Sequence, residues 1–434
     1  MKKWSVDPRI VASFFILALG FAGSYGIPIA TKSSVVSTSF PAQACPVIST
    51  AGSTSVYLPS TKLNIRFIDS KSTRFSLTSR SVIPLTNHAL LVDSNPGTSL
   101  SFASSPGSGL AVTPCSPGSP DEWFIGGSGG LTSKGTVDLV NSGLSTSSVE
   151  IYPFTSKVAL PAIPVVVKAN SSATLSLDAL APGEESMALH VITRTGRVST
   201  FLLDQRSKGL RSLGMDFVKP WEAPQTDLTF SGIYPHNGGK SSVQNYLRLL
   251  VPGSLDANVR LEAISSDGKF IPLGFDGIAV KRGQVLTLPL TNLTTNSAFA
   301  LHLHSDQPVL AGVLTTMGSG DFAWASPSNA LTKAQINFGG ATPVVVFTGA
   351  TIQLHLTGRY INGKNFSQEV HGSDLAIWSP KIGVSTVHFS SSGKPPVYAG
   401  AIINSGGLTY FPISDGGSIE NTALPFSDVH TLTR

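Results

Sequence analysis

Short runs in which apolar and polar residues alternate recur along most of the chain, separated by turns rich in Gly, Pro, Ser and Asn. The clearest unit is an apolar-His-apolar run, a polar turn and a second apolar run. It occurs at residues 188–203, 300–313 and 386–401. A period of two is typical of β-strands, so we interpret this unit as one β-hairpin that the chain repeats three times.

The strands around this unit recur as well, because apolar runs at 136–140, 246–250 and 344–347 open the three repeats. The dipeptides Asp267-Gly268 and Asn362-Gly363 mark hairpin turns. Six or seven short strands in about 100 residues predict an all-β fold of tandem immunoglobulin-like β-sandwich modules. A β-propeller is the alternative, although its blades are usually half this length.

These patterns divide the chain into eight parts. They are a cytoplasmic stub (1–9), a transmembrane signal-anchor or signal peptide (10–30), a polar linker (31–44), an N-terminal β module (45–120), three β-sandwich repeats (121–222, 227–328 and the shorter 334–415) and a flexible tail (416–434). The third repeat is short between Glu369 and Val384, and we expect that it needs strands of the first module to close its sheets.

The N-terminal apolar stretch follows Lys2, Lys3 and Arg9. A membrane-spanning helix needs about 20 apolar residues, and basic residues stay on the cytoplasmic side. The stretch therefore predicts a single-pass membrane protein whose remaining chain lies outside the cytoplasm. A signal peptide cleaved near the small residues Ala22-Gly23-Ser24 would instead give a secreted protein, and we favour the retained anchor.

The amino-acid composition restricts the classes of partner that the protein can bind. Charged residues make up only 13% of the chain, and the net charge of +5 is spread without any long Lys/Arg run. Because a nucleic-acid surface usually shows a basic stripe, we expect no nucleic-acid partner. The hydrophobic fraction of 41% excludes general disorder.

The two cysteines, Cys45 and Cys115, both follow the apolar stretch. In an oxidising compartment an even pair favours a disulfide, and two unrelated buried thiols are the alternative. Neither cysteine has the C-x-x-C spacing or the nearby histidine of a zinc site, so we expect no metal there.

Histidines are the most suggestive candidates for chemistry. His302 and His304 lie two apart on a predicted strand with Asp306 close by, which is compatible with part of a metal site. However, His190, His302 and His388 share one repeat position, and equivalent positions of separate modules lie far apart. We therefore expect structural histidines and no metal.

The run Gly126-Gly127-Ser128-Gly129-Gly130 matches the G-x-S-x-G pattern of hydrolases, but that pattern needs a following helix, and here a turn and a strand are predicted. Glu184-Glu185 lies in a Pro-Gly turn, and we interpret it as part of a solvated loop. No phosphate-binding loop or dinucleotide motif is found, so we expect no catalytic residues and no cofactor.

Tryptophans are the remaining candidates for ligand binding. Trp221 and Trp324 stand near the ends of two repeats, where each follows an Asp-Phe pair. Their position favours packing at module corners, and stacking on sugar rings is the alternative.

Several turn-and-strand motifs together resemble a family of actinobacterial, membrane-anchored secreted proteins known only as a domain of unknown function. The motifs are Cys115 shortly before the run 123–127, the runs 139–143 and 177–183, and Gly209 leading to the run 214–216. The resemblance covers most of the chain and implies an extracytoplasmic protein, with no catalytic residues to transfer.

Together these observations predict a non-catalytic, membrane-anchored module of the cell envelope that serves interaction or assembly. Possible partners are the membrane, a cell-wall glycan or another envelope protein. A carbohydrate-binding protein or carbohydrate-active enzyme of the cell wall, with its site between modules, is the alternative function.

Overall fold

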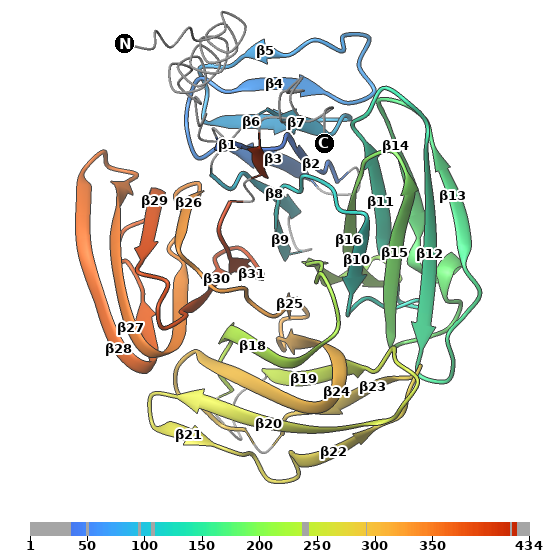
Figure 1. Ribbon diagram of the computed structural model, residues 1–434, viewed down its shortest axis with the longest axis vertical. Coiled ribbons are helices and arrows are strands. Elements are labelled where there is room, and N and C mark those ends of the chain that lie inside the picture. Colours follow the sequence, from blue (N-terminus) through green and yellow to red (C-terminus); the bar gives the residue numbers. More distant parts are fainter. Residues whose placement is uncertain are drawn as a thin grey trace, which may run out of the picture. The chain divides into compact units, whose positions relative to one another are not determined.

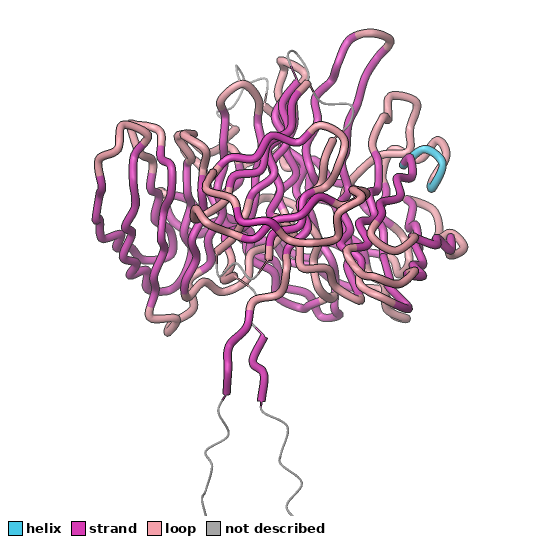
Figure 2. The backbone as a smooth tube through the Cα atoms, turned by 90° about the horizontal axis from the view of Figure 1, so that it is seen from above, coloured by secondary structure: helices cyan, strands magenta, loops and turns pink. Residues whose placement is uncertain are grey.

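The computed structural model describes residues 36–48, 52–93, 97–105, 109–236, 243–291, 293–416 and 419–422. These residues form an all-β structure, as the sequence predicted, and their one helix is the single turn α2 (Leu177–Leu180) (Figure 2). The predicted membrane segment at 10–30 lies outside the described residues. In the described parts, no helix is long and apolar enough to cross a bilayer.

The described chain separates into two units. In the smaller unit, β1 (Val36–Ser39) and β32 (Ile419–Thr422) form a two-stranded antiparallel ladder. The region predicted as a linker thus contains β1 and the start of β2 (Gln43–Cys45), and the region predicted as a flexible tail contains β32. Local sequence could not show β1 and β32, because each of them depends on a partner at the other end of the chain.

The larger unit, residues 40–418, contains four modules with the same strand pairing. Module 1 consists of β2 (Gln43–Cys45), β3 (Ser53–Tyr57), β4 (Asn64–Phe67), β5 (Ser76–Leu77), β6 (Val82–Leu85), β7 (Leu90–Val92), β8 (Leu100–Ser105) and β9 (Gly109–Pro114). Module 2 consists of β10 (Asp121–Phe124), β11 (Thr136–Asn141), β12 (Ser147–Thr155), β13 (Ile163–Val167), β14 (Ser171–Ser176), β15 (Met187–Thr195), β16 (Val198–Lys208) and β17 (Arg211–Val218).

The other two modules use longer, shared strands. Module 3 consists of β18 (Gln225–Ile233), β19 (Gln244–Leu250), β20 (Ala257–Ser265), β21 (Gly268–Phe270), β22 (Asp276–Val280), β23 (Val285–Pro289), β24 (Phe299–Thr316) and β25 (Phe322–Ala325). Module 4 consists of β26 (Lys333–Asn337), β27 (Val344–Tyr360), β28 (Asn365–Trp378), β29 (Val384–Ser391), β30 (Tyr398–Asn404) and β31 (Leu408–Ile413).

Modules 1 and 2 each consist of two four-stranded antiparallel sheets, whereas shared long strands join the two layers of module 3 into one eight-stranded sheet and those of module 4 into one six-stranded sheet. In modules 1 and 2 one sheet joins the first, sixth, third and fourth strands, and the other joins the fifth, second, seventh and eighth. Module 3 keeps this order with β24 serving as both the sixth and the seventh strand. In module 4, β27 serves as the second and third strands and β28 as the fourth and fifth.

The interpretation of the repeated His-containing unit as a hairpin is wrong. In module 2 its two apolar runs are β15 and β16, which belong to different sheets, and in module 3 they are the two ends of the continuous strand β24. The turn between the runs is a corner that carries the chain from one sheet to the other. The hairpins predicted at Asp267-Gly268 and Asn362-Gly363 do form, between β20 and β21 and between β27 and β28.

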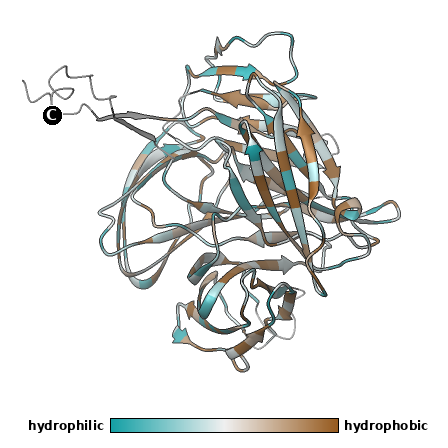
Figure 3. Cartoon of the chain, turned by 45° about the vertical axis from the view of Figure 1, so that its right-hand side comes forward, coloured by the Kyte–Doolittle hydropathy of each residue, from teal (hydrophilic) through white to brown (hydrophobic). Residues whose placement is uncertain are grey.

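The two sheets of a module pack face to face over an apolar core. Along β12 buried and partly exposed residues alternate, and its inward residues Val149 and Ile151 pack with Val137 and Leu139 of β11. Figure 3 shows the same alternation as bands of different hydropathy along the strands. This is the period-two pattern that the sequence displayed.

The four modules close into a ring around their last strands. β17 contacts β9 and β25, and β31 contacts β25 and β9, so each inner strand contacts two others. Figure 1 shows β9, β25 and β31 near the middle of the ring. Module 4 reaches module 1 directly, because the Asn337 side chain donates to the Leu58 carbonyl at 2.7 Å. Among the described residues, no strand of module 1 joins the ladders of module 4, and an isolated bridge links Thr98 to Ile336.

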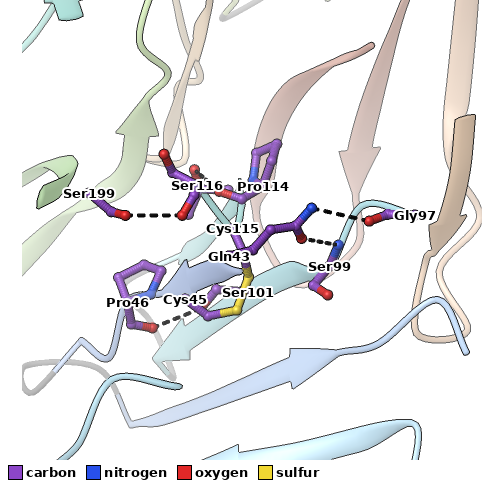
Figure 4. The surroundings of a disulfide bond; sticks show 11 residues. Gln43, Cys45, Pro46, Gly97, Ser99, Ser101, Pro114, Cys115, Ser116 and Ser199 are labelled. Carbon is purple, nitrogen blue, oxygen red and sulfur yellow. Dashed lines mark hydrogen bonds between the residues drawn. A yellow bond between two sulfur atoms is a disulfide. The ribbon is translucent and has the colours of Figure 1, made fainter. Parts of the chain in front are cut away.

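The predicted disulfide between Cys45 and Cys115 is confirmed. It joins the first strand of module 1 to the residue that follows the last, and hence one sheet to the other (Figure 4). Beside it, Gln43 binds the backbone of Gly97 and Ser99, and Ser199 of module 2 donates to the Ser116 carbonyl. The bond therefore stands where module 1 meets module 2.

Candidate functional site

A pocket of about 340 Å³ opens where the four inner strands end, and we call it the axial pocket. Every module contributes a proline to its lining. These prolines are Pro114 at the end of β9, Pro220 after β17, Pro327 after β25 and Pro412 in β31. The pocket exists only because the ring is closed, and Cys115 of the disulfide forms part of its wall.

Below the pocket the inner strands are held together by one buried carboxylate, Asp216 of β17. It accepts hydrogen bonds from the Trp324 amide of module 3 at 2.8 Å and from the Thr409 hydroxyl of module 4 at 2.7 Å. The Thr409 hydroxyl in turn accepts from the Val112 amide of module 1. Asp216 therefore connects all four modules.

Lys219 completes this centre and reaches the pocket lining. Its ammonium donates to both oxygens of Asp216 at 3.1 Å and to the Phe217 carbonyl at 2.8 Å. Burial raises the pKa of Asp216 to about 7 and lowers the pKa of Lys219, while each partner's charge acts in the opposite direction. All donors of this lysine are used, so it offers no free charge to the pocket.

The opposite ends of the inner strands are tightly packed against one another. Gly109 and Gly214 have positive φ, and a Cβ on either would lie within 2.6 Å of the Asp321 carboxylate. The second oxygen of Asp321 accepts from the Leu408 amide at 2.6 Å. Burial raises the pKa of Asp321 to about 6. Only glycine fits these two positions, since both the φ angle and the space exclude a side chain.

Glu122 of β10 is the most unusual group of the pocket lining. It is 4% exposed, and its Oε2 atom has no hydrogen-bond partner. Burial raises its pKa to about 8, while the nearby Thr200 lowers it in part. This carboxyl is therefore mostly protonated at neutral pH.

The pocket contains one of the two predicted tryptophans. Trp221 belongs to its lining, is 7% exposed, and has an indole N–H without a partner. Trp324 is 1% exposed, donates to Asp204 at 2.9 Å and packs under the Arg248 guanidinium at 4.8 Å. Trp324 therefore presents no face to solvent on which a sugar could stack, and it packs at the corner between modules 2 and 3.

The histidine candidates lie outside the pocket. The acidic neighbour of His302 and His304 is Asp227 of β18, at 3.7 and 2.9 Å, and the expected neighbour Asp306 instead accepts from the Asn258 amide. Within the described residues no group of three or more His, Cys, Asp or Glu side chains is placed to hold a metal. His190 stacks on Trp123 with ring centres 3.6 Å apart.

Ser128 is fully buried, and its hydroxyl donates to Glu185 at 3.2 Å. The residues after it form turn and strand rather than a helix. Glu184 pairs with Lys157 at 3.1 Å. Both acids lie in a loop, as the sequence predicted, and Glu185 is exposed.

Sequence reasoning missed the buried pair of Asp216 and Lys219, and it missed Glu122 of the pocket lining. The equivalence of Asp216-Phe217 with Asp321-Phe322 at the repeat ends was a usable signal, since both aspartates lie at the ring axis. Glu122 could not be selected from the sequence, because its neighbour Thr200 and much of the pocket lining lie far from it along the chain.

The fold and pocket define an all-β protein in which four β modules enclose a small axial pocket. By its sequence the chain belongs to the family of unknown function DUF5719, whose model matches residues 89–369. No curated protein matches the sequence. Among solved structures, "Structure of infectious bursal disease virus Gt strain" aligns at 11% identity with a TM-score of 0.10. That alignment covers 91% of this chain and 81% of that chain, and a likeness this weak carries no argument.

Proposed function

We propose that this protein is a non-enzymatic binding and assembly module of the cell envelope. In this proposal residues 10–30 anchor it in the membrane and the four-module ring lies outside the cytoplasm. The observation that carries the proposal is the closed ring with a pocket lined by all four modules. A pocket at the junction of rigid modules is a common place for ligands.

The disulfide supports the location, because such bonds persist in oxidising compartments. The basic residues before the apolar segment support the orientation. The resemblance to actinobacterial membrane-anchored secreted proteins agrees with both.

We further infer that the modules are relatives of the immunoglobulin-like sandwich. The second and fifth strands pair in one sheet and the third and sixth in the other, as B with E and C with F do in that fold. The first and seventh strands have exchanged sheets relative to it. This exchange turns the loop between the sixth and seventh strands into the corner described above.

A carbohydrate-binding role is the second candidate, and Trp221 in the pocket lining favours it. An aromatic ring beside polar groups is a typical setting for a sugar, although little of this ring is exposed.

Labelling of intact cells with a membrane-impermeant amine reagent tests the location. The full-length protein should be labelled in intact cells and remain with the membrane fraction after carbonate extraction. Protection from the reagent would overturn the location, and a mature N-terminus near Tyr25 in mass spectrometry would overturn the anchor. Co-sedimentation with purified cell-wall polysaccharide, saturable and lost in Trp221→Ala, would support the carbohydrate role.

A further inference from the structure

The axial pocket contains a buried acid that the protein satisfies only in part. Thr200 donates to the carboxyl of Glu122, a residue of the pocket lining, but the Oε2 atom is screened from solvent and has no hydrogen-bond partner. Leaving such a group without a partner costs about 1–3 kcal/mol, more if it ionises. In native structures buried polar atoms almost always have a partner, so an exception at a pocket points to a ligand that supplies the missing donor.

The charges around the pocket favour a cation. Four carboxylates belong to its lining, namely Asp121, Glu122, Glu222 and Asp415, and the one basic side chain is Lys219, which is already bound to Asp216. Asp121 contacts His190 at 2.8 Å, and Asp415 accepts from the Thr332 and Lys333 amides at 2.7 and 2.8 Å. Glu122 is therefore the buried acid that remains for a ligand, with Glu222 exposed at the pocket.

The rest of the lining suits a compact carbon body. Prolines from all four modules, together with Phe201 and Trp221, provide apolar walls. The unpartnered indole N–H of Trp221 is a donor for a ligand oxygen. A volume of about 340 Å³ lies at the lower end of the usual range for small-molecule pockets.

We propose that the axial pocket binds a small ligand through a primary ammonium group, which Glu122 receives, while the carbon body of the ligand packs against Trp221 and the proline walls. This inference rests on the proposed binding role and deepens it by assigning the site and the ligand chemistry. An amino sugar and a lysine-like side chain both carry this chemistry. When the ammonium binds, the Glu122 carboxyl ionises and its proton passes to the buffer.

Calorimetric titration of the full-length protein in detergent tests the inference. Glucosamine and Nα-acetyl-lysine amide are the cationic probes, and N-acetylglucosamine and Nα-acetyl-norleucine amide are their uncharged counterparts. At least one cationic probe should give saturable heat, with its counterpart at least tenfold weaker, and the probe that binds identifies the source. Equal binding of the uncharged counterparts, or no saturable heat up to about 10 mM of any probe, would overturn the inference.

Variants locate the binding. Glu122→Gln should weaken the cationic probe at least tenfold, because the amide cannot take the charge. Asp276→Asn removes the same charge at an exposed position that pairs with Arg260, and it should leave the affinity unchanged. An unaltered affinity in folded Glu122→Gln would show that Glu122 does not bind the ammonium group.

The wild-type protein provides a measurement that does not depend on the folding of a variant. At pH 7 binding should release close to one proton per ligand, so the observed enthalpy should change with the ionisation enthalpy of the buffer. Binding without proton release would contradict the role of Glu122. Neither result bears on the location of the protein, so cell-surface labelling can succeed while the ligand assignment fails.

Discussion

Two buried acids near the ring axis differ in how they are satisfied. Asp216 receives donors from modules 2, 3 and 4 at both of its oxygens, and it is fully enclosed. Glu122 lies at the pocket, where Thr200 donates to its carboxyl but Oε2 has no hydrogen-bond partner. The comparison indicates that burial alone does not mark a functional acid, because the first carboxylate holds the ring together and the second lacks a partner.

We expect the largest loss of stability when the disulfide in the pocket wall is removed. Replacing Cys45 and Cys115 by serine removes a cross-link between residues 70 positions apart. The chain-entropy model gives a loss of about 4 kcal/mol for a loop of this size. Urea unfolding followed by intrinsic fluorescence measures it, and a loss below about 1 kcal/mol would show that the ring holds the two sheets without the bond.

We expect the second-largest loss of stability at the buried pair of Asp216 and Lys219. Lys219→Met leaves Asp216 buried without its cation and should cost about 3 kcal/mol, because an uncompensated buried charge is strongly unfavourable. The double variant Asp216→Asn/Lys219→Met should be less destabilised than the sum of the two single variants. Additive effects in urea unfolding would mean that the two groups do not act as a pair.

The pH dependence of Glu122 extends to higher pH than that of the other buried acids, because the pKa values of Asp216 and Asp321 are raised only to about 7 and about 6. The pKa of Glu122 is raised from 4.5 to about 8 in the folded protein, so it binds a proton that the unfolded chain releases between these values. Its contribution to stability is therefore fully present below about pH 4.5 and is lost as the pH rises toward 8, at up to about 1.4 kcal/mol per pH unit. Glu122→Gln should lessen this decline across pH 5–8, measured by urea unfolding. An unchanged slope would show that Glu122 does not titrate with a raised pKa.

The exposed histidine cluster should show the smallest effect. Asp227 contacts His304 at 2.9 Å, but both side chains are more than half exposed. Asp227→Asn should cost less than about 1 kcal/mol near neutral pH, as usual for surface pairs. A larger loss of stability in thermal unfolding would show that the pair of Asp227 and His304 contributes substantially to the stability of the fold.

Strand positions followed from local sequence where alternation was clear. Val149 and Ile151 face the core as the period-two pattern requires, and the turn dipeptides at Asp267 and Asn362 lie between paired strands. The short strands β2, β5, β6 and β9 of module 1 escaped notice, since stretches of two to six residues carry too little pattern. For the same reason the common strand order of module 1 and the three repeats was not seen.

The candidate site was much less predictable. Trp221 was selected and does belong to the axial pocket, whereas Trp324, chosen on the same repeat position, is buried between modules. Equivalent sequence positions thus acquire different surroundings, because the ring places different modules beside them.

The sequence by itself determined the strand class, the alternation of inward and outward residues, and the cysteine pair, because these depend on neighbouring residues or on simple pairing. Only the tertiary structure decided which sheet each strand joins, that four modules close into a ring, and that Glu122 and Trp221 meet at its axis. A corner and a hairpin have the same local pattern. They differ only in their partners far along the chain, and those partners are chosen by packing of the whole unit.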